Sequence, residues 1–248
     1  MKRSVRLAGW TGFFLVLLVL WQLAAAAIHN SLILPEPMQV LDAMIGQLNS
    51  PDFFMTIGGT FLRVILAIAA SIVIGVFLAF LAAHFKTAAF FLDKAILILR
   101  SIPNISFIIL ALFWLNSTQA VFVVLVLLIM PVIYSAVCER LNEIEKEYKD
   151  LLVLFPQPWH VRFRDLYLPE LEGTFLASLT TAVSLGLKGG VMAEVLCQVP
   201  VGIGHSLQAD RFALETAGVI GWTIWLLLVT FLTDSLIRTL SRHIADRT

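Results

Sequence analysis

The chain has 248 residues, of which 59% are hydrophobic and only 14% are charged. Soluble domains carry about 25% charged residues, so this composition is typical of a membrane protein. The 17 basic and 17 acidic side chains cancel to a formal net charge of zero, so bulk charge gives no indication of a nucleic-acid partner.

Six apolar runs are long enough to cross the hydrocarbon core of a bilayer as helices, which takes roughly 20 residues each. No run alternates apolar and polar residues as the strands of a membrane barrel do. We therefore predict an all-α membrane protein in which residues 1–248 form a single transmembrane domain. The expected spans cover residues 10–28, 62–83, 95–115, 118–138, 173–195 and 214–236.

The first apolar run, residues 10–28, can also be interpreted as a signal peptide. Lys2 and Arg3 precede it, and the small residues Ala24–Ala27 close it. The run is longer than the roughly 7–15 residues of a usual signal core, and its removal would leave five spans. We expect a retained span, with cleavage as the alternative.

The basic residues outside the spans predict the orientation of the chain. Lys and Arg are absent from His29–Thr60, whereas they precede the first span, recur throughout residues 139–170 and follow the sixth span. Because cytoplasmic loops carry the excess of Lys and Arg, we expect both termini and residues 139–170 in the cytoplasm.

Residues 139–170 form a charged segment that contains an apolar repeat. Leu141, Ile144, Tyr148, Leu151 and Phe155 recur at spacings of three and four, which predicts one face of an amphipathic helix. Such a helix between two spans either lies on the bilayer surface or docks into another protein. The pattern alone leaves both alternatives open.

Short motifs follow one another along nearly the whole chain. They are Leu34-Pro35-Glu36-Pro37, Leu99-Arg100-Ser101-Ile102-Pro103, Leu168-Pro169, Ala193-Glu194 with Gly202-Ile203-Gly204, and Ala217-Gly218-Val219 with Asp234 through Arg238. Their order and spacing resemble the membrane subunit of bacterial ABC importers, in the nitrate/sulfonate/bicarbonate, or taurine-type, permease group.

The resembled family carries a cytoplasmic loop of Glu-Ala-Ala, three residues and Gly, followed by a Leu-Pro pair about a dozen residues later. Counting back from Leu168-Pro169 places Asp150 at the Glu position, Leu151-Leu152 at the Ala-Ala position and Pro156 at the Gly position. The spacing is kept although the residues differ. The resemblance implies an ATPase-coupling segment, which we assign to Tyr148, Asp150, Leu151, Leu152, Phe155, Pro156 and Trp159.

The resemblance also implies the type I fold of ABC importer permeases, a short cytoplasmic coupling helix and a place in the bacterial inner membrane. It implies three kinds of protein partner: a second permease subunit, as a homodimer; a cytoplasmic ATPase dimer that carries ATP and Mg²⁺; and an extracytoplasmic substrate-binding protein. The substrate would be a small organic or inorganic anion, such as a sulfonate or nitrate, or a vitamin precursor.

The chain lacks the motifs of an enzyme or an ATP-binding protein. It has no Gly-x-x-x-x-Gly-Lys-Ser/Thr phosphate loop, no Gly-x-Ser-x-Gly and no His-Glu-x-x-His. We therefore expect a translocation subunit with no catalytic residue, metal or cofactor of its own. The alternative is a stand-alone secondary carrier or channel, which would need no ATPase dock.

Ionisable residues inside spans are the candidate path residues, because each costs roughly 2.5–3.5 kcal/mol at the centre of a bilayer. Arg100 precedes Pro103, which loosens the helix, and Arg100 either lines a path or snorkels to the cytoplasmic surface. Lys188 lies deeper, where we expect a polar cavity or an ion-pair partner. Glu194 is about 240° from Lys188 around a helix, so the two face different neighbours. These four are the predicted path residues.

Gly186 and Gly190 form a Gly-x-x-x-Gly pair inside the fifth span. Such pairs let two helices approach closely, although glycines in a transporter can also permit a bend. We favour the packing role.

Overall fold

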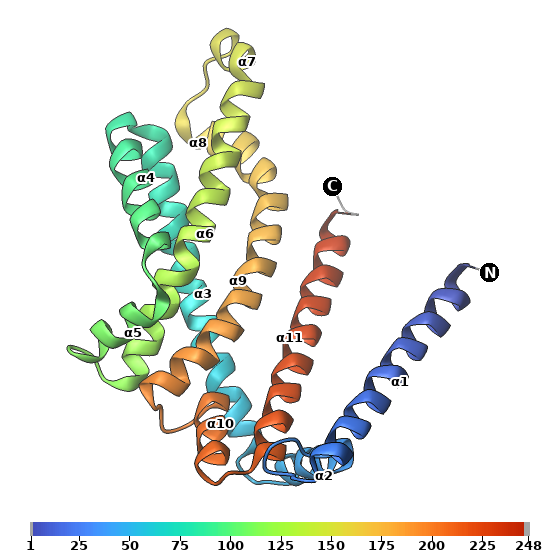
Figure 1. The fold of residues 1–248 in the computed structure, drawn as a ribbon. Helices are drawn as coiled ribbons and strands as arrows, with labels where there is room; N and C mark the ends of the chain where they lie inside the picture. The colour runs from blue at the N-terminus through green and yellow to red at the C-terminus, as the bar shows by residue number, and fades with distance from the viewer. Residues whose placement is uncertain (1, 246–248) are drawn as a thin grey trace.

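In the computed structural model the backbone is described for residues 2–245, and side chains are described for residues 12–158, 160–237 and 239. All regular structure in this part of the chain is helical (Figure 1). The elements are α1 (Lys2–Ile28), α2 (Pro37–Leu48), α3 (Phe53–His84), α4 (Lys86–Ser101), α5 (Asn104–Leu112), α6 (Ser117–Glu147), α7 (Lys149–Leu154), α8 (Trp159–Arg162), the π-helical turn η1 (Phe163–Tyr167), α9 (Leu168–Cys197), α10 (Ile203–Phe212) and α11 (Thr216–Ala245).

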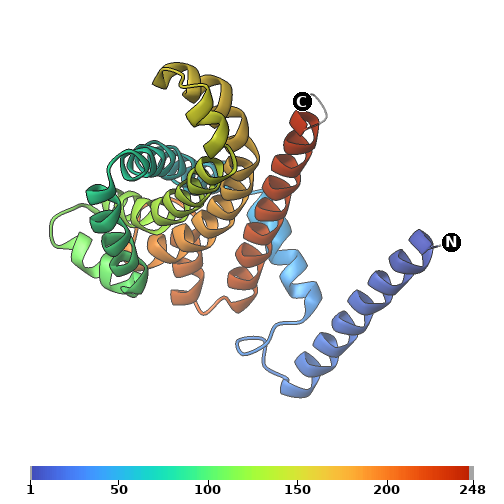
Figure 2. The same cartoon turned by 90° about the horizontal axis from the view of Figure 1, so that it is seen from above.

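The molecule has two opposite ends, which we name after the short helices there. The α7 end carries α7 and α8, and the α10 end carries α2 and α10 (Figure 1). The long helices α3, α6 and α11 run from the α10 end toward the α7 end, whereas α9 runs in the opposite direction (Figure 1). Helix α1 also leaves the α10 end, and it stands apart from the bundle in both views (Figures 1 and 2).

The core lies between α3, α6 and α9, and it includes the buried side chains of Ile129, Ile133 and Leu187. Glycines bring α9 close to its neighbours. A Cβ on Gly186 would lie 2.9 Å from the Val64 side chain, and a Cβ on Gly190 would lie 3.0 Å from the same residue. The packing role predicted for the Gly-x-x-x-Gly pair is therefore confirmed.

Among the described residues, four helices are long and apolar enough to cross a membrane: Phe53–His84, Ser117–Glu147, His160–Cys197 and Thr216–Ile237. A fifth span results if α4 and α5 count as one broken span. The part of α1 whose side chains are described, Gly12–Ile28, is also apolar but shorter. The all-α membrane fold is confirmed, and the full count of six spans stays a prediction.

The span predicted over residues 95–115 is broken into two helices. Helix α4 ends at Ser101, α5 begins at Asn104, and the two are bent by 92°. Ile102 is extended, with φ −79° and ψ 129°, because the ring of Pro103 disfavours a helical conformation in the residue before it. The break leaves Arg100 in the last turn of α4.

The amphipathic segment is divided differently from the prediction. Leu141 and Ile144 belong to the last turns of α6 and are buried in the core. The backbone leaves the helix at Tyr148, and α7 is a separate helix of six residues. Leu151 and Phe155, which the spacing placed on the same face, are exposed at the α7 end. Apolar spacing joined two helices because it does not show where the helix axis changes direction.

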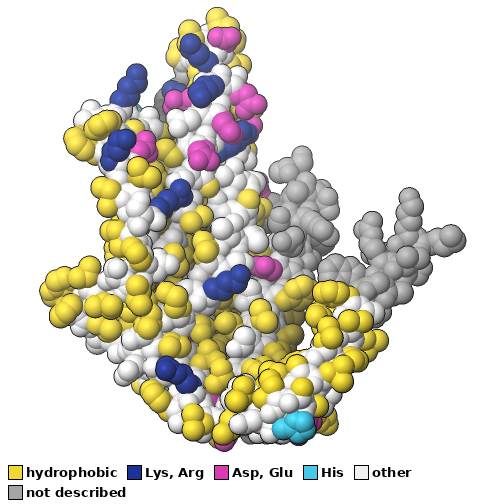
Figure 3. Space-filling model, in the orientation of Figure 1, with side chains coloured by type: hydrophobic (Ala, Val, Ile, Leu, Met, Phe, Trp, Pro, Cys, Tyr) yellow, Lys and Arg dark blue, Asp and Glu magenta, His cyan; other side chains and the backbone are white. Residues whose placement is uncertain are grey.

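The surface separates an apolar zone from a charged end. On the face drawn in Figure 3, charged side chains gather at the α7 end, and hydrophobic side chains cover much of the remainder. Large apolar side chains are exposed along α1, α3 and α11. Exposed apolar surface of this extent is expected where helices contact lipid.

Candidate functional site

The predicted ATPase-coupling segment forms an exposed tip at the α7 end. Leu152 is half-buried, and the side chain of Trp159 lies outside those described. An apolar cluster at the tip of a charged segment is typical of a protein docking surface. We call the exposed residues of this segment the α7 tip: Asp150, Leu151, Val153, Leu154, Phe155 and Pro156.

A polar cluster fastens the base of the α7 tip. Arg140 in α6 donates hydrogen bonds to the backbone carbonyl and to the carboxylate of Glu170 in the first turn of α9. Carboxylate oxygens of Glu143 and Glu147 lie 3.1 Å and 3.7 Å from the same guanidinium. We call these residues, with Tyr148, the Arg140 cluster. Because it joins α6 to α9, the intervening segment starts and ends at points that are tied together.

Tyr148 belongs to this cluster and not to the exposed tip. Its hydroxyl donates to Glu170 Oε1 at 2.8 Å, and its side chain is half-buried. The hydrogen bond to that carboxylate raises the pKa of Tyr148. The structure therefore places Tyr148 at the base of the tip, and its contact with an ATPase stays a prediction.

At the α10 end, Glu194 is a buried carboxylate with a full set of donors. Only 1% of the residue is exposed. The hydroxyl of Thr60 donates to it at 2.8 Å, the N–H of Gly204 donates at 3.0 Å, and Arg63 forms an ion pair with it. A buried charge is tolerated when it is paired and hydrogen-bonded, as Glu194 is here.

The donors of Glu194 make further contacts across the same site. Arg63 also donates to the carbonyl of Val201 at 2.6 Å, and the N–H of Ile203 donates to the Thr60 hydroxyl at 2.8 Å. We call Thr60, Arg63 and Glu194 the Glu194 network. It connects α3, the end of α9, the turn after α9 and the start of α10.

The sequence interpretation missed Arg63 and gave Glu194 a different place. Arg63 lies inside the span predicted for residues 62–83, just before the uncharged run that begins at Val64, but it is not among the predicted path residues. A basic residue inside one apolar helix and an acidic residue inside another could have suggested the pair. The structure encloses Glu194 in the network, and its place in the path stays a prediction.

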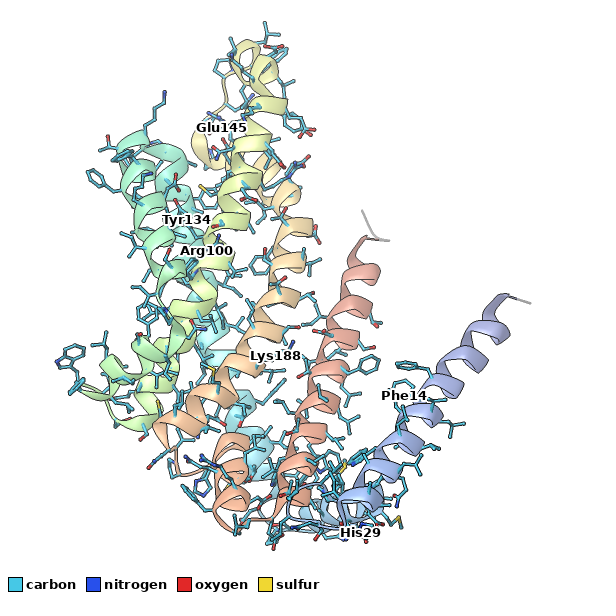
Figure 4. The ribbon with its side chains drawn as sticks, in the orientation of Figure 1. Phe14, His29, Arg100, Tyr134, Glu145 and Lys188 are labelled. Carbon is cyan, nitrogen blue, oxygen red and sulfur yellow. The ribbon has the colours of Figure 1, made fainter. Side chains whose placement is uncertain are left out.

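Lys188 is exposed on α9 and lies well inside the helix (Figure 4). No described acidic side chain forms a salt bridge with it. One turn earlier, the Ser184 hydroxyl donates to Asp234 of α11 at 3.3 Å. The sequence interpretation did not select Asp234 as a site residue, although it too is a charge within a span. The α9–α11 face therefore carries both a basic and an acidic side chain.

Arg100 is attached to the neighbouring helix. Its guanidinium donates to the backbone carbonyl of Pro131 inside α6 at 2.9 Å. On the same pair of helices, the hydroxyl of Tyr134 donates to Asp93 at 2.7 Å, and Figure 4 shows Arg100 and Tyr134 close together. The side chain of Arg100 is also exposed, so its two alternatives, lining a path and snorkelling, both stay predictions. Pro103 contributes the break between α4 and α5.

Comparison with known proteins places these sites in a family. The family model of the binding-protein-dependent transport system inner membrane component matches residues 71–246 of this chain. These residues include the Arg140 cluster, the α7 tip and Lys188. The chain is similar to the formylaminopyrimidine transport permease protein ThiX of Halalkalibacterium halodurans, with 25% identity over 236 residues, 90% of this chain and 93% of ThiX.

Two further relatives extend this similarity. The taurine transport system permease protein TauC of Escherichia coli is 23% identical over 92% of this chain and 85% of its own length. The nitrate import permease protein NrtB of Synechocystis is 26% identical over 76% of this chain and 71% of its own length. The resemblance to taurine-type ABC permeases is thereby confirmed. The chain belongs to the family of binding-protein-dependent transport system inner membrane components.

Proposed function

We propose that this chain is the translocation subunit of an ATP-driven importer. Two copies enclose a substrate path, and a cytoplasmic ATPase dimer that binds ATP and Mg²⁺ docks on the two α7 tips. An extracytoplasmic binding protein delivers substrate at the α10 end, around residues 34–55 and 198–212. The observation that carries the proposal is the exposed α7 tip, whose base the Arg140 cluster ties to two long helices.

The α7 tip is suited to transmit motion from a docked protein. Leu151, Val153 and Phe155 are 52%, 73% and 64% exposed, so a partner can bury much of their surface. Full burial of one such side chain contributes about 1.5–3 kcal/mol. Because the base is fixed to α6 and α9, a displacement of the tip displaces these helices as well.

This function requires the α7 end in the cytoplasm, with both termini on the same side. Figure 1 supports it, since α1 and α11 both extend from the α10 end toward the side of α7. A reporter that is active only outside the cytoplasm should work when fused near Asn49 or Gln208 and fail near Glu145 or after Arg247. Activity near Glu145 would invert the arrangement and remove the ATPase dock.

We propose a small anion or a vitamin precursor as the substrate; the names of the relatives give formylaminopyrimidine, taurine and nitrate. The ammonium group of Lys188 would be unfavourable in contact with lipid at this depth of the helix. Its exposed side chain is therefore expected to contact water or the second copy of the chain. We propose that the α9–α11 face lines the path and that Lys188, with Arg100, favours anions. Lys188→Met should lower transport with normal expression. Unchanged transport would remove Lys188 from the path.

The rival proposal, a stand-alone carrier or channel, predicts that no ATPase binds to the chain. Affinity purification of the chain from its native membrane should recover an ATPase, which Leu151→Asp and Leu154→Asp should each lose. Leu32→Asp at the α10 end is the matched control, since Leu32 is 60% exposed, between Leu151 at 52% and Leu154 at 73%. Loss of the ATPase from the control, or its retention by both tip variants, would contradict docking at the α7 tip.

A further inference from the structure

The turn after α9 reverses the chain sharply and has little regular structure of its own. Gln198 and Gly202 have φ values of 52° and 143°, both in the left-handed region. Helix α10 follows immediately, with ten residues. A short helix after such a turn keeps its position only if other contacts hold it.

Those contacts come from the Glu194 network and from very close packing. A Cβ on Gly204 would lie 2.4 Å from the Cβ of Glu194 and 2.8 Å from the carbonyl oxygen of Val191. A Cβ on Gly202 would lie 2.7 Å from the Glu194 carboxylate. The first turn of α10 thus rests directly on α9, and only glycine leaves room for the buried carboxylate.

We infer that Thr60, Arg63 and Glu194 are positioning residues that hold α10 as a rigid extension of α3 and α9. Thr60 and Arg63 each contact both Glu194 and the segment that leads into α10, so neither helix can separate from α10 without breaking several charge-assisted hydrogen bonds. A protein that presses on α10 therefore moves α3 and α9 directly, without an intervening hinge. In this last respect the inference rests on the proposed function, which brings a binding protein to the α10 end.

Cys197 is a native reporter of this arrangement. It is the last residue of α9, three residues after Glu194, and only 3% of it is exposed. The chain has just one other cysteine, Cys138, near the opposite end. In a Cys138→Ser background, the reaction of Cys197 with N-ethylmaleimide in isolated membranes measures how often the buried end of α9, from which the turn into α10 begins, becomes exposed.

Gly204→Ala should make Cys197 react at least tenfold faster, because the added methyl group pushes α10 away from α9. Gly58→Ala is the matched control, since a Cβ on Gly58 meets nothing within 4 Å, and it should react as the parent does. Thr60→Val replaces the hydroxyl with a methyl group and should also make Cys197 react faster. Thr60→Ser keeps the hydroxyl, so Cys197 should react as slowly as in the parent. Equal rates in Gly58→Ala, Gly204→Ala and Thr60→Val would overturn the inference.

General loosening of the fold is separated by the second cysteine. In a Cys197→Ser background, Cys138 should react at the same rate in the parent and in Thr60→Val. If Cys138 also becomes faster, the network supports the whole fold and not α10 in particular, which contradicts the inference. The labelling needs no substrate and no ATPase, so its outcome is independent of whether an ATPase co-purifies.

Discussion

The two ends of the molecule each join a neighbouring helix to α9 through an arginine and a glutamate, yet in different surroundings. At the α10 end, the side chains of Arg63 and Glu194 are 14% and 1% exposed. At the α7 end, those of Arg140 and Glu170 are 24% and 28% exposed. The pairs are chemically alike, but water reaches the second pair from both sides.

This difference in exposure sets what each pair contributes. An ion pair in a water-excluded site is strong only while both partners are present, because either one alone is a stranded charge. A partly exposed pair gains little stability, since water and salt replace the lost partner. Breaking the ion pair is therefore expected to cost more stability at the α10 end than at the α7 end.

The largest expected effect tests this difference at the buried pair. Arg63→Met should destabilise the protein by about 3–5 kcal/mol, because it leaves the Glu194 carboxylate buried without a counter-charge. Adding Glu194→Gln should recover part of the loss, since the stranded charge is removed. Thermal unfolding in detergent measures both variants. A double variant no better than Arg63→Met would mean that Glu194 is not paired as described.

A matched comparison of two hydroxyls is expected to give an intermediate effect. Thr60 and Tyr148 each donate to a glutamate at 2.8 Å, one at either end. Thr60→Val should lower stability by about 1–3 kcal/mol, because it also leaves the buried N–H of Ile203 without an acceptor. Tyr148→Phe should leave the unfolding temperature nearly unchanged. Equal shifts in the two variants would show that exposure does not distinguish the two ends.

A smaller effect is expected at the Arg140 cluster. Arg140→Met should lower the stability by about 1 kcal/mol or less at low salt. This loss should become smaller at high salt, because salt screens the exposed charges. ATP-driven transport should fall more than stability does, because the tip loses its tie to α9. A large loss of stability that is insensitive to salt would instead make the cluster part of the core.

The smallest effect concerns pH. The Glu170 carboxylate raises the pKa of Tyr148, so the phenol keeps its proton more firmly in the folded chain. The stability from this contact is present below the ordinary tyrosine pKa of about 10 and is lost as pH rises through the higher folded value. The tyrosinate absorbance of wild type minus that of Tyr148→Phe should therefore appear at a higher pH in the folded protein than after denaturation. An identical titration midpoint in the folded and the denatured protein would contradict the hydrogen bond between Tyr148 and Glu170.

Several features followed from local sequence alone. Long apolar runs predicted membrane-spanning helices, because a helix satisfies its own backbone hydrogen bonds in lipid wherever it lies in the fold. The order of the motifs predicted the family. Pro103 indicated a weak point in the third run, but the angle at the break, 92°, depended on how α5 packs beside α6.

Partnerships between distant residues were decided only by the tertiary structure. Arg63 and Glu194 are 131 residues apart, and no spacing rule connects them. Likewise, the apolar repeat in residues 141–155 could not show that Leu141 is buried in the core while Leu151 is exposed, because helical periodicity ends where the axis turns at Tyr148. The sequence by itself determined that the chain is an all-α membrane protein, since that depends on the composition of its apolar segments. Which charges are buried together depended on how α3, α6 and α9 pack, because only packing excludes water from a pair.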